Sequence, residues 1–113
     1  PANRRRGEIA ATIDGQERIL CLTLGALAEL ESAFAVDDLA ALAERFSTGR
    51  LSARDLTRVL AAGLRGGGNA VSDEEVAAMR FEGGTAGCAA IIGELLAVTF
   101  GGESPGKGEA PRP

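Results

Sequence analysis

The chain has 113 residues, a length that typically builds one hydrophobic core. Its 45% hydrophobic and 25% charged residues make it too apolar for a disordered chain and too charged for a membrane protein. Because the sequence contains no His, Trp or Tyr, it excludes imidazole catalysis, imidazole metal ligation and recognition by indole or phenol groups.

Charge is distributed unevenly along the chain. Arg4, Arg5 and Arg6 form a basic run, whereas residues 7–100 contain seven basic and fourteen acidic side chains, a net charge of −7. Nucleic acid is repelled by a body of this charge. We therefore expect no nucleic-acid partner.

Composition also predicts the location and the organisation of the chain. The longest apolar stretch, 87–100, is interrupted by Gly93 and Glu94 and is shorter than the roughly 20 residues that cross a bilayer, so we expect no membrane partner. No signal-peptide pattern opens the sequence, and Cys21 and Cys88 are too few for a disulfide scaffold, which predicts a reduced, cytoplasmic protein. The expected organisation is a mobile basic arm (1–6), a single α+β domain (7–100) and a disordered Gly/Pro tail (101–113).

Residues 8–24 predict a β-hairpin. Two β-favouring runs flank Asp14-Gly15, a pair that suits a type I′ turn and sets Ile13 opposite Gln16. This register predicts a buried face and an outer face, with Ile19 as the apolar exception on the outer one. The buried face carries Ile9, Ala11, Ile13, Leu20, Leu22 and Leu24, and the outer face carries Glu8, Thr12, Glu17, Cys21 and Thr23.

Beyond Gly25 the apolar residues recur every three or four positions, which indicates helices. A first helix contains Leu27, Leu30 and Phe34 and has Thr23 as its N-cap. A second helix follows Asp37 as N-cap and ends at Gly49, a suitable left-handed residue. Its inner face consists of Leu39, Leu42, Ala43 and Phe46.

Two capping boxes predict the next two helix starts. Ser52 with Asp55 opens a third helix that stops at Gly66-Gly67-Gly68, and Ser72 with Glu75 opens a short fourth helix that runs through Met79. Each box is flanked by a hydrophobic staple. The staple pairs are Leu51 with Leu56 and Val71 with Val76, and the third helix continues its apolar stripe with Val59, Leu60 and Leu64.

Gly83-Gly84 separates the fourth helix from a last one over about 85–100. One side of this last helix is apolar and the other carries small residues that permit close packing, so we expect it to be the central helix. The apolar side has Cys88, Ile91, Ile92, Leu95, Leu96 and Thr99, and the small residues are Ala86, Gly87, Ala89, Ala90 and Gly93. The expected fold class is α+β, an N-terminal antiparallel β-hairpin followed by a small bundle of four to five helices that cover its apolar face.

The sequence contains no convincing chemical site. Gly66–Gly68 lacks the Lys-Ser/Thr of a P-loop, Asp73–Glu75 lacks the pattern of a calcium loop, and two cysteines without His cannot complete a zinc site. We predict no catalytic, cofactor-binding or metal-binding residues and no cofactor. A row of arginines along the third helix suggests a basic ridge that faces solvent or a protein partner. A DNA-binding helix is the less favoured alternative, because the body of the chain is acidic. The row consists of Arg50, Arg54, Arg58 and Arg65.

Four segments resemble the small gene-transfer-agent tail proteins of alphaproteobacteria, a family described as tail tube proteins or as tail assembly chaperones. These segments are NRRRGEIAATIDG, LCLTLGALAELESAF, VDDLAALAERFSTGRLSARDL and GLRGGGNAVSDEEVAAM, and the resemblance covers nearly all of residues 3–100. It implies a non-enzymatic phage-like, or prophage-like, tail morphogenesis protein that acts as a tail assembly chaperone and binds the tape measure protein and the tail tube protein. A structural tube component is the alternative, and self-association through the hairpin edge is a further expected contact.

Together with the resemblance, the acidic composition suggests how such a partner would bind. A groove between helices, bordered by Asp37, Asp38, Glu74 and Glu75, would receive an amphipathic helix with basic flanks.

The hairpin pattern predicts the effect of one core substitution. Leu22→Ala should lower the free energy of unfolding by about 2–5 kcal/mol, because Leu22 lies on the predicted buried face. Chemical denaturation of both proteins measures this difference. An unchanged unfolding midpoint would show that Leu22 is not a core residue.

Overall fold

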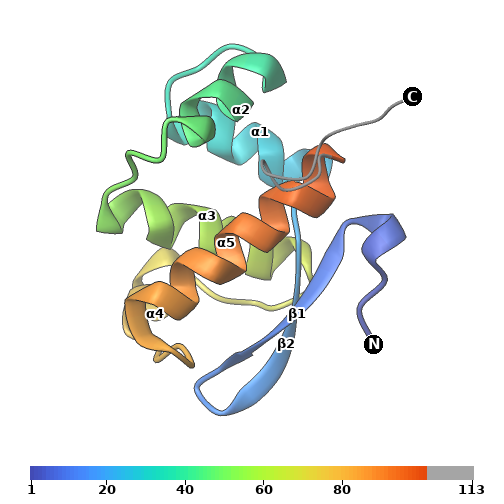
Figure 1. Ribbon diagram of the computed structural model, residues 1–113, viewed down its shortest axis with the longest axis vertical. Coiled ribbons are helices and arrows are strands. Elements are labelled where there is room, and N and C mark those ends of the chain that lie inside the picture. Colours follow the sequence, from blue (N-terminus) through green and yellow to red (C-terminus); the bar gives the residue numbers. More distant parts are fainter. Residues whose placement is uncertain (102–113) are drawn as a thin grey trace, which may run out of the picture.

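The chain forms a two-stranded antiparallel hairpin followed by five α-helices, as the computed structural model shows for the residues that it describes, 1–101 (Figure 1). The predicted α+β fold class is thereby confirmed. A 3-10 turn, η1 (Arg4–Arg6), precedes the strands β1 (Glu8–Ile13) and β2 (Gln16–Cys21). The helices are α1 (Leu24–Ala33), α2 (Leu39–Ser47), α3 (Ala53–Gly66), α4 (Asp73–Ala77) and α5 (Gly84–Phe100).

The hairpin has the predicted turn and register. Asp14 and Gly15 both have positive φ, 54° and 75°, and Ile13 lies opposite Gln16. The inner side chains of both strands are buried, except that Arg18 is half-buried and Gln16 exposed near the turn. The prediction for Leu24 is wrong: its side chain is 79% exposed, because β2 ends at Cys21 and Leu24 is already the first residue of α1.

Helix N-caps follow the sequence closely. The Thr23 hydroxyl accepts a hydrogen bond from the Ala26 amide, and both predicted capping boxes are formed. In α2 the cap is Asp38 instead of Asp37, since the helix begins at Leu39 and the carboxylate of the preceding residue accepts from the Ala41 amide at 2.8 Å. As the first residue of that helix, Leu39 is exposed and does not belong to the predicted inner face.

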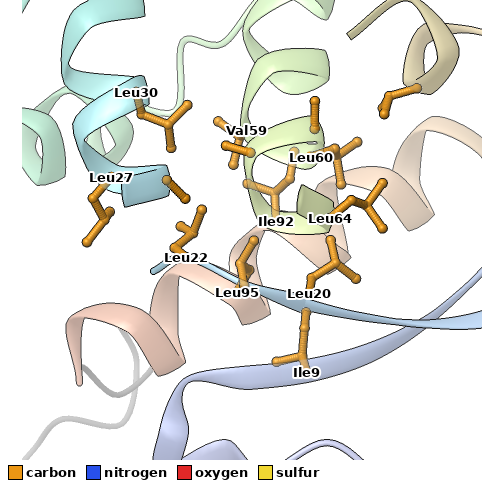
Figure 2. Packing of buried hydrophobic residues seen from close by; sticks show 14 of the residues in the cluster. Ile9, Leu20, Leu22, Leu27, Leu30, Val59, Leu60, Leu64, Ile92 and Leu95 are labelled. Carbon is orange, nitrogen blue, oxygen red and sulfur yellow. The ribbon is translucent and has the colours of Figure 1, made fainter. Parts of the chain in front are cut away.

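The central helix is α3, and the expectation that α5 would be central is wrong. Every residue from 59 to 64 is buried, and α3 contacts β2, α1, α4 and α5. Figure 2 shows Val59, Leu60 and Leu64 of α3 above the hairpin residues Leu20 and Ile9, with Leu27 and Leu30 of α1 to their left.

Helix α5 packs on one side of this core. Of its residues only Ile92 and Leu95 are fully buried, and its small outer residues Ala86, Ala89 and Gly93 are exposed. Because α5 is apolar nearly all round, its sequence does not indicate which face is covered.

The glycines at the end of α3 allow its backbone to reach β2. A Cβ atom on Gly66 would lie 2.0 Å from the carbonyl oxygen of Cys21, and one on Gly67 would lie 2.0 Å from that of Ile19. The Asn69 side-chain amide then donates to the Ile19 carbonyl oxygen at 2.9 Å. The glycine cluster therefore joins helix to strand, in addition to its predicted role as a helix stop.

The structure describes the N-terminal arm but almost none of the predicted C-terminal tail. Asn3 caps η1, and Arg4 forms an ion pair with Glu94 of α5. The mobility of the basic arm stays a prediction. Apart from Gly101, the predicted tail lies outside the described residues.

A pair of alanine substitutions tests the contact between α3 and β2. Gly67→Ala should lower the free energy of unfolding by about 1–3 kcal/mol, because the added methyl group overlaps backbone that cannot rotate away. Gly93→Ala is the matched control, since a Cβ there meets no atom within 4 Å and should raise stability by about 0.5–1 kcal/mol. Thermal unfolding of both variants measures the change in stability. Equal changes for Gly67→Ala and Gly93→Ala would contradict the close contact between the end of α3 and β2.

Candidate protein-binding surfaces

The two cysteines are free in the structure and lie on different elements. The Cys21 thiol on β2 donates to the Arg6 carbonyl oxygen, and Cys88 is half-buried in α5. Burial raises the pKa of both thiols, and for Cys21 the nearby Glu8 carboxylate raises the pKa further while Arg6 lowers it. A raised pKa keeps a thiol protonated and weakly nucleophilic.

Within residues 1–101, no group of three or more Cys, Asp or Glu side chains is arranged to hold a metal ion. In the same part of the chain, no helix is long and apolar enough to cross a membrane.

The predicted arginine row, whose first member Arg50 precedes α3, does not form a continuous solvated ridge. Arg58 donates to the Ala33 carbonyl oxygen of α1 at 3.1 Å. Arg65 pairs with Glu29 of α1 at 2.8 Å and with Asp73 of α4 at 3.1 Å. These two arginines hold neighbouring helices, whereas the two at the start of the row remain exposed.

The free edge of β2 is covered. Ile13 and Gln16 flank the turn and pair directly. Because the backbone N–H and C=O groups of successive residues point to alternate sides of a strand, those of Ile19 and Cys21 point away from β1. The end of α3 lies against those two residues, and the Asn69 amide hydrogen-bonds to one of them. This edge is therefore closed to another strand.

The free edge of β1 is held at both ends. The Glu8 amide donates to the Asn3 carbonyl oxygen at 3.1 Å, and the Asp14 amide donates to the Arg80 carbonyl oxygen at 2.8 Å. Between these contacts lie the outward backbone groups of Ala10 and Thr12. Strand addition to the hairpin is thus restricted to this short part of β1.

An open cleft of about 660 Å³ lies between the first half of α3, the α4 segment and the start of α5. Its volume is within the range typical of ligand-binding clefts. The apolar residues that line it include Leu56, Leu60, Val76, Met79, Phe81 and Cys88. Such a surface is suited to the apolar face of a bound segment.

One end of the cleft is positively polarised. Among residues 1–101, Arg80 is the only charged residue that lines the cleft, and Gly84 and Thr85 line it from the start of α5. The N-cap of α5 is Gly83, which provides no side-chain acceptor, and the first turn contains no acidic residue. The amide groups and the dipole of the helix therefore add partial positive charge near Arg80.

The predicted acidic groove does not exist. Asp38 caps α2, whereas Glu75 belongs to the capping box of α4, and these two helices lie well apart in Figure 1. None of Asp37, Asp38, Glu74 and Glu75 lines the cleft. The prediction failed because acidic residues beside a helix start are used for capping and the helix dipole, which a sequence cannot distinguish from a binding rim.

The first turn of α3, which forms one wall of the cleft, is anchored by Asp55. Its carboxylate accepts from the Ser52 amide and from Arg45 of α2, each at 3.0 Å. Arg45 also lies over the ring of Phe34, with 5.5 Å to the ring centre. The hydrogen bond from the Ser52 backbone is the main cause that lowers the pKa of Asp55, although partial burial opposes it and Arg45 assists.

Comparison with known families identifies the group to which the chain belongs. The family described as "Phage tail tube protein, GTA-gp10" matches residues 6–102. The match includes the hairpin, all five helices and the cleft. The chain is a member of this family, which places it among the tail proteins of phage-like gene transfer agents.

The predicted resemblance is thereby confirmed at the level of the tail family. Searches of curated proteins and of solved structures give no match to the chain.

The Asp55 carboxyl predicts a pH-dependent difference in stability. Asp55→Asn should lower the free energy of unfolding at pH 7 by about 0.5–1 kcal/mol, because the charged capping and ion-pair contacts are weakened. The pKa of Asp55 in the folded protein is below its ordinary value of 3.8. The stabilisation is therefore complete above that pH and is lost as the pH falls through the folded pKa.

Urea denaturation from pH 7 to pH 2.5 measures the two curves, which should converge on acidification. Asp37→Asn provides the control, since this exposed residue caps no helix in the structure. A gap between wild type and Asp55→Asn that stayed constant with pH would contradict the role given to the carboxylate.

Proposed function

We propose that the protein is a tail assembly chaperone of a gene-transfer-agent tail, without enzymatic activity, and that it acts in the cytoplasm. Its partner is the tape measure protein. The chaperone binds an apolar helical segment of that partner until tail tube subunits replace the chaperone. The observation that supports this proposal is the open apolar cleft between α3, α4 and α5. Membership of the tail family supplies the setting.

A structural role in the tail tube is the second candidate, and the description of the family favours it directly. The hairpin geometry argues against one way of building such a tube. A ring closed by strand addition requires two open sheet edges in each subunit, but the end of α3 covers the edge of β2. A ring would have to use other surfaces, and self-association through the sheet is limited to Ala10–Thr12 of β1.

Coexpression with a fragment of the tape measure protein from the same tail tests the proposal. The fragment should become more soluble and should copurify with this protein, because apolar helical surface is kept from aggregating. A fragment that stays equally insoluble with and without the protein would contradict the chaperone function.

Analysis of purified particles separates the two candidates. A chaperone should be absent from the particles and run as a small species in gel filtration, whereas a tube protein should be present in stoichiometric rings. Rings in the particles would replace the chaperone proposal with the structural one.

A further inference from the structure

The cleft between α3, α4 and α5 has a polarity that restricts what it binds. Its walls are apolar along most of their length, with Leu56 and Leu60 on one side and Val76 and Met79 on another. Met79 adds an adaptable side chain, which is common at surfaces that accommodate helices. These walls match an aliphatic stripe, such as the one that an amphipathic helix presents.

Arg80 is held at one end of this cleft through its backbone. Its amide donates to the Asp14 carboxylate at 2.8 Å, and its carbonyl oxygen accepts from the Asp14 amide at 2.8 Å. The hairpin turn therefore fixes the position from which the guanidinium projects. A charge on a fixed backbone position selects an orientation of the bound segment.

The guanidinium of Arg80 has no acidic partner within the described residues. The ion pairs formed among residues 1–101 involve Arg4, Arg6, Arg45 and Arg65. Asp14 and Glu82 line a neighbouring hollow that Arg80 also lines, but neither of them lines the cleft or forms an ion pair with Arg80. The positive charge at this end of the cleft is thus left for a bound molecule.

The start of α5 reinforces that charge. Its first amides have no side-chain acceptor at the Gly83 cap, and the first turn lies against the cleft at Gly84 and Thr85. A carboxylate placed here would meet Arg80 and the positive end of a 17-residue helix together.

We propose that the cleft binds the apolar face of an amphipathic helix, oriented by an acidic residue at the end of that helix that pairs with Arg80. The charge preference is the reverse of the basic flanks that the sequence predicts. The assignment of this helix to a tail protein rests on the proposed chaperone function, whereas the chemistry of the cleft is tested separately with defined peptides.

Two model peptides provide that test. Both are amphipathic helices with Leu at positions i, i+3, i+4 and i+7, and they differ only in carrying Glu or Lys at one end. The protein carries Cys21→Ser, so that Cys88 in the cleft is the only thiol. Titration calorimetry gives the affinity, and the rate of Cys88 alkylation by iodoacetamide reports whether the cleft is occupied.

The Glu peptide should slow the alkylation of Cys88 and should bind about tenfold more tightly than the Lys peptide at low ionic strength. High salt should reduce this preference. Arg80→Glu should reverse it, and the fold should persist because the side chain is exposed and its backbone contacts are kept. Arg5→Glu is the matched control, since Arg5 is an exposed residue of η1 that does not line the cleft, and it should leave the preference unchanged.

Equal affinities for the two peptides, or an unchanged alkylation rate at saturating Glu peptide, would overturn the inference. If that result came with a tape measure fragment still solubilised by the protein, the chaperone function would stand and only the cleft assignment would fall. If the Glu peptide bound in an Arg80-dependent way but the fragment stayed insoluble, the cleft assignment would stand and the chaperone function would fall.

Discussion

The close approach of α3 to the edge of β2 is the contact on which the rest of the structure depends. It requires glycine at two consecutive positions, because a Cβ on Gly66 or Gly67 would overlap a strand carbonyl oxygen. Asn69 completes the contact: its amide nitrogen donates to Ile19, and its oxygen accepts from Arg18 at 3.2 Å.

With α3 fixed against the hairpin, α1, α4 and α5 pack on α3, and α2 packs on α1. At the same end of α3, Arg65 joins the helix to α1 and α4. On another side, Leu95 of α5 packs so closely that a Cβ on Gly63 would lie 2.8 Å from it. The same contact closes one edge of the sheet. A single feature thus determines the core, the order of the layers and the surface that remains open to partners.

Local signals made much of this fold predictable. The turn pair Asp14-Gly15 determines the register, and Ser52 and Ser72 mark helix starts through hydrogen bonds to residues three positions on. Such signals involve neighbours in the sequence, so they do not depend on how the helices pack. These signals locate a helix start only to within about one residue. The cap of α2 is Asp38 and not its neighbour Asp37, because either aspartate could act as the N-cap.

Tertiary placement was less predictable for a physical reason. The apolar composition of α5 suggests burial on all sides, but a small domain has too few elements to cover it, and α3 became the central helix instead. Gly67 gives no sign in the sequence that it touches a strand. Arg65 likewise gives no sign that two carboxylates from other helices will surround it. The cleft was missed for the same reason, because it is formed by three segments whose packing no local pattern specifies.

The distribution of exposed apolar side chains bears on the choice between a transient binding protein and a tube subunit. Among residues 1–101, the large apolar side chains that are exposed are Leu24, Leu39 and Phe100, on three different helices. Permanent subunit interfaces are large and rich in apolar side chains, and a tube subunit needs such an interface with each neighbour in its ring. Scattered single residues do not supply one.

The cleft, by contrast, keeps its apolar residues recessed, so the free protein exposes little that would cause aggregation. A protein that must stay soluble alone, bind one apolar segment and then release it requires this combination. In a tube subunit, a segment of a neighbouring subunit would have to fill such a site. The recessed cleft therefore supports the proposed role during tail assembly, while the family description supports a place in the tube.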